Sequence, residues 1–141
     1  MSEENKALAR RFFRMLELGD PGMADEIVAA DYTNHDAPDP NIGSEGVKAG
    51  VTRFKKAFPD AQVQIVFQLA EGDKVVTRYT WSGTHQGEFV GIPATGKQVN
   101  WTATITFRIA DGKIREAWYN MDAWGLMQQL GVVPTPGQSG S

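Results

Sequence analysis

The fold is decided by residues 101–131, which read WTATITFRIADGKIREAWYNMDAWGLMQQLG. The first part alternates apolar and polar residues, and this alternation predicts a half-buried strand. The dipeptide Asp111-Gly112 predicts a tight hairpin turn and a second strand after it. The last part has the pattern of a short amphipathic helix. One carboxylate, Asp122, stands between the second strand and that helix.

The chain before this stretch predicts three helices and then a strand. Apolar residues at helical spacing favour a helix over residues 3–18, a shorter helix soon after it, and a third over about 44–58. Beyond the third helix, Val63, Ile65 and Phe67 alternate with polar residues, so we expect these three side chains on the inner face of a strand.

The intervening segments complete the expected topology. Residues 71–74 predict a hairpin turn into a return strand over 75–82, and glycine-rich residues 83–97 predict an extended or bulged loop. Residues 31–36 are interpreted as a polar segment too short for a helix. Helices followed by hairpin-connected strands indicate an α+β fold. We expect a strongly curved, mainly antiparallel sheet that wraps the helices around one apolar cavity, as a single domain over 1–133 with a flexible tail over 134–141.

Composition excludes several classes of partner. The chain has 141 residues, no cysteine and a formal net charge of −3, and its pI is about 5.3. An acidic balance argues against nucleic acid and anionic membrane surfaces as partners. The charged beginning of the chain is unlike a secretory signal, and no apolar run approaches the roughly 20 residues of a membrane span. We therefore expect a cytoplasmic protein.

The facing of Asp122 depends on the register of the hairpin. If the loop contains two residues, Ala110 pairs with Lys113, and the residue numbers of every cross-strand pair add up to 223. This register places Asp122 on the apolar inner face with Trp101, Trp118 and Asn120. It places Glu116 on the inner face as well. A carboxyl group among indole rings is poorly solvated, and desolvation raises its pKa toward the range of general acid–base catalysis. A three-residue loop with a bulge shifts the register by one and moves Asp122 to the opposite, threonine-rich face.

Asp122 also has a structural interpretation as the N-cap of the helix that follows it. The two roles are compatible, because a capping carboxylate can still face a cavity.

The two histidines each allow two interpretations. His35, beside Asn34, either hydrogen-bonds a ligand carbonyl or ties down a turn, and the same alternatives apply to His85 in the glycine-rich segment. Their separation lacks the spacing of a metal site, so we expect no metal. The chain has no nucleophile elbow and no phosphate-binding glycine loop. Its four tryptophans suit either a plain core or a cavity for a flat apolar ligand.

Several motifs together resemble the SnoaL-like polyketide cyclase family of the nuclear-transport-factor-like superfamily. The resemblance covers most of the chain up to Gly131, and its most specific part is the hairpin with Glu116, Trp118 and Asp122. The other matching pieces are Tyr32-Thr-Asn-His-Asp36, Phe58-Pro-Asp60, Gly83-Thr-His-Gln-Gly87, Gly91-Ile-Pro-Ala-Thr-Gly96, Phe107-Arg-Ile-Ala-Asp-Gly-Lys-Ile114 and Gln129-Leu-Gly131.

This resemblance implies a cone-shaped α+β barrel, open at one end, and commonly a homodimer packed through the sheet. It implies an aspartate, here Asp122, that drives an intramolecular aldol ring closure without metal or cofactor, and it implies a pocket lined by Asn34 and His35. It also implies an assisting histidine on the strand over 99–109, a strand that contains none.

Three functions follow as hypotheses. The first is a cofactor-independent cyclase-type enzyme that acts on an apolar or polycyclic ketone, with Asp122 as general acid and base and with Asn34, His35, His85, Trp101, Trp118 and Asn120 around the substrate. The second is a non-catalytic protein that binds small apolar molecules. The third is isomerase or hydrolase chemistry in the same cavity, where Asn34, Asn120 and Asp122 are the candidates to position water.

Overall fold

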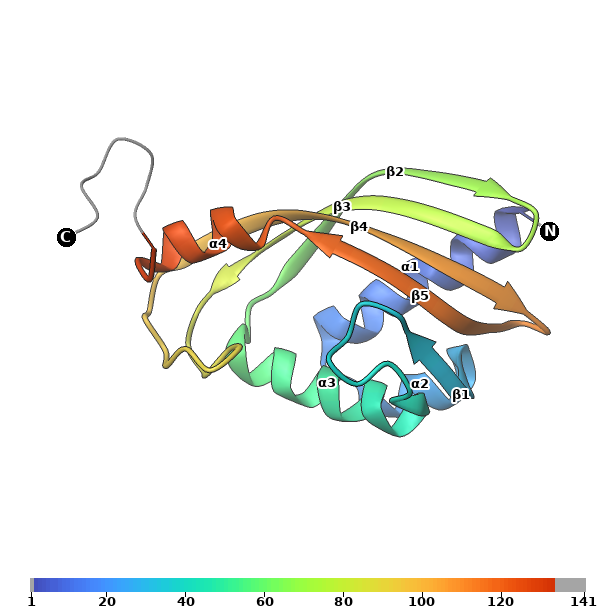
Figure 1. Cartoon of the computed structure of the whole chain (residues 1–141), viewed down its shortest axis with the longest axis horizontal. Coiled ribbons are helices and arrows are strands. Elements are labelled where there is room, and N and C mark those ends of the chain that lie inside the picture. The colour runs from blue at the N-terminus through green and yellow to red at the C-terminus, as the bar shows by residue number, and fades with distance from the viewer. Residues whose placement is uncertain (1, 134–141) are drawn as a thin grey trace.

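The structure is a computed structural model, and it describes residues 2–133. The first helices of the chain lie together on one face of a single sheet (Figure 1). The first helix ends where Gly19 adopts a positive φ of 67°, a conformation that glycine takes without steric cost. The helical segments are α1 (Ser2–Leu18), the 3-10 turn η1 (Pro21–Met23), α2 (Ala24–Ile27), α3 (Gly43–Ala57) and α4 (Ala123–Leu130).

The sheet is five-stranded, mixed and open. Its strands lie in the order β1-β5-β4-β3-β2, and β1 runs parallel to β5 while the other pairs are antiparallel. The expected α+β class, with helices inside a curved sheet, is confirmed. The strands are β1 (Val28–Asn34), β2 (Gln62–Glu71), β3 (Lys74–Thr84), β4 (Gln98–Ala110) and β5 (Lys113–Met121).

One strand was absent from the sequence prediction. Residues 31–34, interpreted as part of a polar segment, belong to β1. This strand lies at the sheet edge and has polar residues on its exposed side, so it lacks the apolar run of a central strand. The predicted tail over 134–141 lies outside the described residues.

The hairpin between β4 and β5 has the predicted two-residue loop but a different register. Ala110 pairs with Lys113 and Ile109 with Ile114, whereas Arg108 pairs with Glu116. Arg115 is therefore an extra residue on β5, and this bulge shifts every later pair by one.

The predicted inward facing of Glu116, Trp118 and Asn120 is consequently wrong. These residues pair with Arg108, Thr106 and Thr104, whose side chains point to the outer face. The main chain of Asp122 continues this pairing, because its N–H donates to the carbonyl of Thr102 at 2.9 Å. Trp101 keeps its predicted inward position and is buried.

A second bulge turns another predicted core residue outward. The β2–β3 register shifts between Ile65 and Phe67, so Phe67 pairs with Arg78 on the outer face and is 49% exposed. Val63 and Ile65 keep their inward facing and pack against the core. Neither bulge coincides with a glycine or proline, so neither carries a composition signal.

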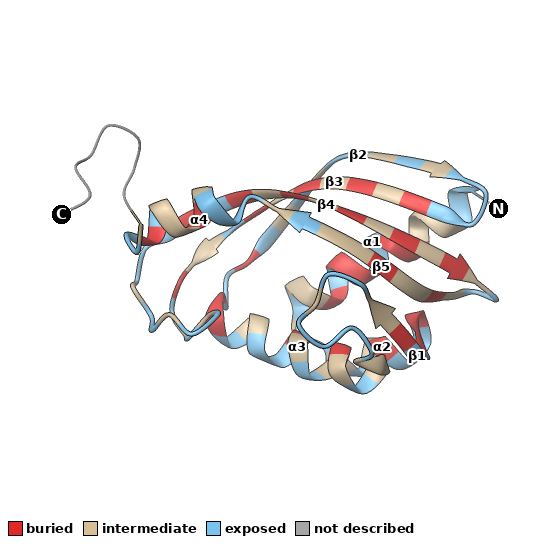
Figure 2. Ribbon diagram, viewed as in Figure 1, coloured by how far each residue is buried: buried red, intermediate tan, exposed pale blue. Residues whose placement is uncertain are grey.

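The core fills the space between the inner face of the sheet and the helices, and buried residues alternate along the central strands (Figure 2). Phe13 of α1 contacts Tyr79 of β3 with ring centroids 4.5 Å apart, and Phe12 contacts Phe107 of β4 at 4.9 Å. Each such aromatic side chain contributes about 2–3 kcal/mol on burial. None of the helices over residues 2–133 is long and apolar enough to cross a bilayer.

Candidate functional site

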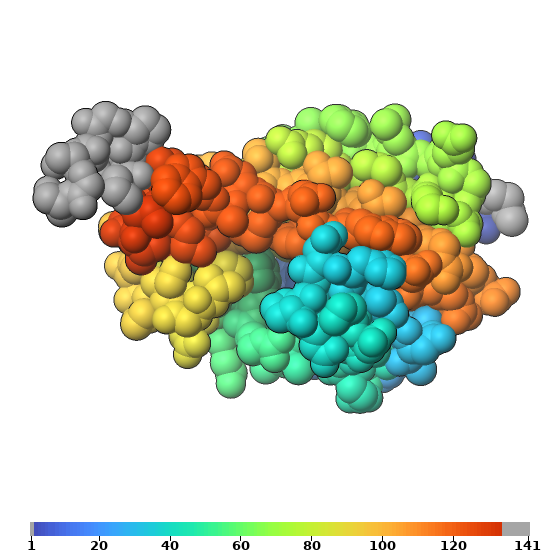
Figure 3. All heavy atoms as spheres, in the orientation of Figure 1, coloured from blue at the N-terminus to red at the C-terminus, as the bar shows by residue number. Residues whose placement is uncertain are grey.

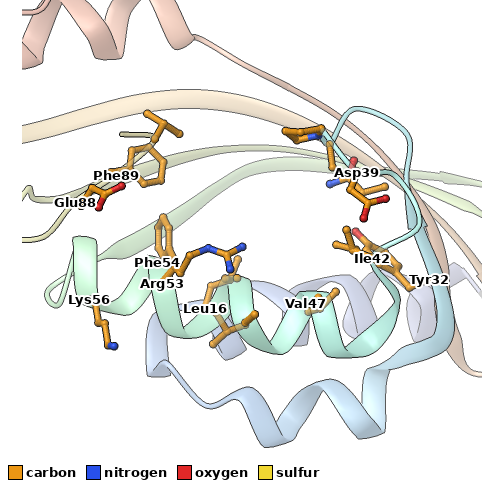
Figure 4. Close-up of a pocket in the computed structure, with 18 of the residues that line it drawn as sticks. Leu16, Tyr32, Asp39, Ile42, Val47, Arg53, Phe54, Lys56, Glu88 and Phe89 are labelled. Carbon is orange, nitrogen blue, oxygen red and sulfur yellow. The ribbon is translucent and has the colours of Figure 1, made fainter. Parts of the chain in front are cut away.

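A cavity of about 910 Å³ lies between α3, α1, β1 and two loops, residues 35–42 and 88–91. Figure 4 shows its side chains projecting from α3 below and from the two loops on either side. The lining is mainly apolar, as expected of a site for a small organic ligand. The apolar side chains that line it are Phe12, Leu16, Tyr32, Ala37, Pro38, Ile42, Val47, Ala49, Val51, Phe54, Phe89 and Val90.

One face of α3 forms a wall of this cavity. Gly46, Ala49, Gly50 and Arg53 all line it, and their spacing places them on one helical face. The Arg53 guanidinium lies over this face, because a Cβ at Gly50 would come within 3.8 Å of its Nη2. The side chains of Arg53 and Ile42 therefore lie against the helix at Gly50 and Gly46, and a ligand would contact these side chains on this wall.

Few polar groups reach the cavity. Asn34 lines it from the end of β1, and Asp39 and Glu88 bring a carboxylate from each loop. Arg53 points into the cavity in Figure 4 and has no ion-pair partner within residues 2–133. The carboxylate of Asp39 accepts a hydrogen bond from the N–H of Asn41 at 3.2 Å, which fixes it in its loop.

Tyr32 adds a buried phenol to the cavity wall. Burial raises the pKa of Tyr32, and burial also raises the pKa of Tyr79 on the neighbouring wall of the core. Both hydroxyls therefore stay protonated over the physiological range. Tyr32 is thus a neutral hydrogen-bond donor beside an apolar space, together with the amide of Asn34.

The mouth of the cavity is visible as a hollow in the molecular surface (Figure 3). It lies between the cyan loop after β1, the yellow loop between β3 and β4, and the orange-red segment where β5 meets α4. Asp122 is the residue that joins β5 to α4.

Asp122 is the N-cap of α4. Its side chain is exposed, and its Oδ1 accepts a hydrogen bond from the N–H of Gly125 at 2.9 Å. The capping interpretation is confirmed. Asp122 is not among the residues that line the cavity, and the predicted inner-face position among indole rings is wrong because of the bulge at Arg115.

His35 lies on the outer side of the sheet and belongs to a polar cluster there. Its Nε2 lies 2.9 Å from Oε1 of Glu116, and the Arg108 Nε donates to Oε2 of the same carboxylate. The His35 ring stacks on Trp118, with centroids 4.8 Å apart and planes 13° from parallel. The hydrogen bonds from Arg108 and then from His35 hold the pKa of Glu116 below its usual value. This cluster fastens the loop after β1 to the sheet.

His85 is fully buried and organises the loop over 85–97. Its Nδ1 accepts a hydrogen bond from the N–H of Thr95 at 3.2 Å and lies 3.0 Å from the Thr95 hydroxyl. Because Nδ1 accepts from a backbone donor, the proton of the neutral ring is on Nε2, which has no partner within residues 2–133. His85 therefore holds the loop that carries the cavity residues 88–91, and it does not line the cavity itself.

The structure thus brings only part of the predicted site together. Asn34 lines the cavity; Trp101 is buried behind it, with its ring 6.3 Å from the cavity residues Phe54 and Phe89. His35, Trp118 and Asn120 lie on the other side of the sheet. Sequence analysis missed the cavity residues Tyr32, Asp39, Arg53, Glu88 and Val90. The spacing of Gly46, Ala49, Gly50 and Arg53 was the available signal for the helical wall.

Comparison with known proteins identifies the family. The sequence profile of the SnoaL-like polyketide cyclases matches residues 6–130. The chain is 34% identical over 131 residues to aklanonic acid methyl ester cyclase DnrD of Streptomyces peucetius, covering 87% of this chain and 90% of that protein. It is also 34% identical to the cyclase of the same description, DauD, of Streptomyces sp. strain C5, covering 87% and 81%.

A solved structure has the same fold over nearly the whole chain. TsrD from Streptomyces laurentii superposes with a TM-score of 0.88 at 30% identity, and the match covers 94% of this chain and 98% of TsrD. The family match extends from α1 to the end of α4. The chain belongs to the SnoaL-like polyketide cyclase family.

Proposed function

We propose that the protein is an enzyme that closes a carbon ring in an apolar, polyketide-like ketone by intramolecular aldol addition. The observation that carries this proposal is the large, mainly apolar cavity in a chain of the cyclase family, with the β5–α4 junction at its mouth. The names of DnrD and DauD, which describe them as cyclases of aklanonic acid methyl ester, support a substrate of this class.

Asp122 is the proposed general base and acid. Its carboxylate removes the proton of a C–H bond activated by a neighbouring carbonyl, and the resulting enolate carbon attacks a ketone carbon of the same molecule. A C–C bond forms, the C=O π electrons move to oxygen, and the protonated Asp122 returns its proton to that alkoxide. The product is an isomer of the substrate, so no other reactant is required.

The cap geometry supports this role for Asp122. The hydrogen bond from Gly125 occupies Oδ1 and orients the carboxylate, while Oδ2 remains for a substrate proton. Within the cavity, the Tyr32 hydroxyl and the Asn34 amide are the proposed donors to substrate carbonyl oxygens.

Asp39 and Glu88 are the competing carboxylates, because both line the cavity. Turnover of an open-ring polyketide ester should fall about a hundredfold or more in Asp122→Asn, which keeps the capping ability and removes the base. Asp39→Asn and Glu88→Gln should retain most of the activity. If Asp39→Asn or Glu88→Gln lost turnover while Asp122→Asn stayed active, the base would be that cavity carboxylate and the assignment to Asp122 would be wrong.

A second candidate function is non-catalytic binding of the same class of ligand. The exposed position of Asp122, outside the cavity lining, favours this alternative. It predicts that a polyketide-like ligand quenches tryptophan fluorescence and raises the melting temperature without being converted, whatever residue stands at 122.

We further propose that two copies pack through the outer face of the sheet, as the family resemblance implies. Phe67 and Leu69 are 49% and 62% exposed on this face. Leu69 pairs with Val76, Val76 with Thr106, and Thr106 with Trp118, so one cross-strand row carries three apolar side chains. An apolar row on an otherwise open sheet face is typical of an interface.

We also propose that the protein is located in the cytoplasm, and cell fractionation tests this location.

A further inference from the structure

We propose that Val90, at the tip of the hairpin Phe89–Ile92, is a ligand-contacting residue that selects for an apolar ring at the mouth of the cavity. This inference rests on the proposed function, because it names a contact within the same site. Val90 lines the cavity and also holds an unfavourable backbone conformation.

The hairpin is a closed two-residue turn. The N–H of Phe89 donates to the carbonyl of Ile92 at 3.0 Å, and the N–H of Ile92 donates to the carbonyl of Phe89 at 2.9 Å. Between them, Val90 has a φ of 46° and Gly91 a φ of 79°. Positive φ at both central residues is the pattern of a type I′ turn, for which Asn-Gly and Asp-Gly are the favoured pairs.

Valine is a poor residue for this position. A β-branched side chain at positive φ is a steric outlier, whereas asparagine, aspartate and glycine tolerate the conformation. The same chain contains the favoured solution, because Asp111 (φ 55°) and Gly112 (φ 71°) form the β4–β5 turn with a similar backbone. Val90 and Asp111 are the two non-glycine residues with positive φ within residues 2–133.

The Val90 side chain gains little from its surroundings in the free protein. It is 66% exposed, although it lines the cavity. The preceding residue, Phe89, is anchored by ring contacts to Phe58 at 5.0 Å and to Trp101 at 6.3 Å. The turn is thus fixed at its base while its tip presents an apolar side chain to water.

The base of this loop is fixed by backbone contacts as well. The N–H of Gln86 donates to the carbonyl of Ala57 at 2.9 Å, and a Cβ at Gly87 would collide with the carbonyl of Lys56. The loop therefore holds Val90 at a set place beside the cavity. A bound ligand with an apolar edge at the mouth would cover the exposed valine and offset the strain of the turn.

The test measures folding and binding in the same variants. Val90→Asn should raise the melting temperature by about 3 °C, because it relieves the strained φ. It should weaken binding of the neutral, flat probe 1,8-dihydroxyanthraquinone, followed by quenching of tryptophan fluorescence, by about fivefold. Val90→Ile keeps the branched apolar side chain, so it should retain the affinity and the lower melting temperature.

Asp111→Val is the matched control. It places the same strain in the β4–β5 turn, so it should lower the melting temperature and leave probe affinity unchanged. Equal probe affinity of Val90→Asn and the wild type would overturn the proposal, and so would a melting temperature in Val90→Asn no higher than that of the wild type.

The outcome is separable from the proposed function. Probe binding requires no turnover, so loss of affinity in Val90→Asn supports the contact even in a protein without cyclase activity. An active cyclase whose Val90→Asn variant binds the probe normally would overturn only the role of Val90.

Discussion

At the scale of the residue, Glu116 joins three segments through one carboxylate. One oxygen accepts from Arg108 on β4 and the other lies 2.9 Å from His35 in the loop after β1. Charge-assisted hydrogen bonds of this kind are stronger than neutral ones, and they favour the ionised form. The position of Asn34 at the cavity wall depends on the same loop being held to β5.

Glu116→Gln should lower the free energy of unfolding at pH 7 by about 1 kcal/mol, a modest value because the site is partly exposed. The hydrogen bonds lower the pKa of Glu116 from its usual value of 4.5, so its stabilisation is complete above that pH and is lost as the pH falls through the lower folded-state pKa. The difference between wild type and variant should therefore shrink from pH 5 to pH 2 in urea unfolding.

Glu26→Gln is the control for this pH dependence, because Glu26 forms an exposed ion pair with Arg11. It should change stability little at any pH. A difference between wild type and Glu116→Gln that stays constant or grows at low pH would contradict the assigned hydrogen bonds.

At the scale of the element, the loop over 85–97 supplies part of the cavity wall, and the bulge at Arg115 sets which β5 side chains face each side of the sheet. The loop is closed by His85 at its start and rests on the end of α3. The bulge sends Glu116, Trp118 and Asn120 to the outer face and leaves Ala117 and Tyr119 on the inner face. The chemistry of each side of the sheet therefore depends on one extra residue.

Gly87→Ala tests the docking of the loop on α3. An added Cβ would meet the backbone carbonyl of Lys56, which has no freedom to move aside, so the variant should lose about 3 kcal/mol of stability and most probe binding. Gly72→Ala is the comparison, because a Cβ at Gly72 meets no atom within 4 Å and only its positive φ of 60° is strained. It should lose about 1 kcal/mol, measured by urea unfolding. Equal losses would contradict the close contact.

Elements with a local sequence signal could be predicted, whereas features that depend on contacts between distant residues could not. Alternation and turn dipeptides give the helices, the central strands and the Asp111-Gly112 loop, because those signals are local. The facing of Asp122 was not predictable, since the bulge at Arg115 depends on how β4 and β5 twist together and has no residue-type signature. The parallel pairing of β1 with β5 is equally non-local, because it joins residues more than 80 positions apart.

At the scale of the whole molecule, α1, α2 and α3 cover one face of the open sheet, and none of these three helices covers the other face (Figure 1). The family resemblance extends over this entire architecture. The fold class and the family therefore follow from the motifs taken together, although the motifs do not predict which side of the sheet each side chain faces. The cavity site required the structure, since its wall combines α1, β1, α3 and two loops.

The sheet face predicts the oligomeric state. The wild type should sediment as a dimer in analytical ultracentrifugation, and Phe67→Lys with Leu69→Lys should sediment as a monomer, because two charges would be buried in the interface. Leu18→Lys is the control, since Leu18 is 49% exposed at the end of α1 and should leave the dimer intact. A dimer that persists in the double variant would place the interface elsewhere.

The central claim, that Asp122 removes a carbon-bound proton from a ligand at the mouth of this cavity, is tested most directly by hydrogen exchange in D2O. The substrate is a polyketide ester analogue that has the activated C–H bond but lacks the ketone required for ring closure, and NMR follows deuterium incorporation at that carbon. The wild type should catalyse exchange well above the solution rate, and Asp39→Asn should do the same. Asp122→Asn should exchange at the solution rate. Exchange by Asp122→Asn at the wild-type rate, or no catalysed exchange by the wild type, would contradict the account.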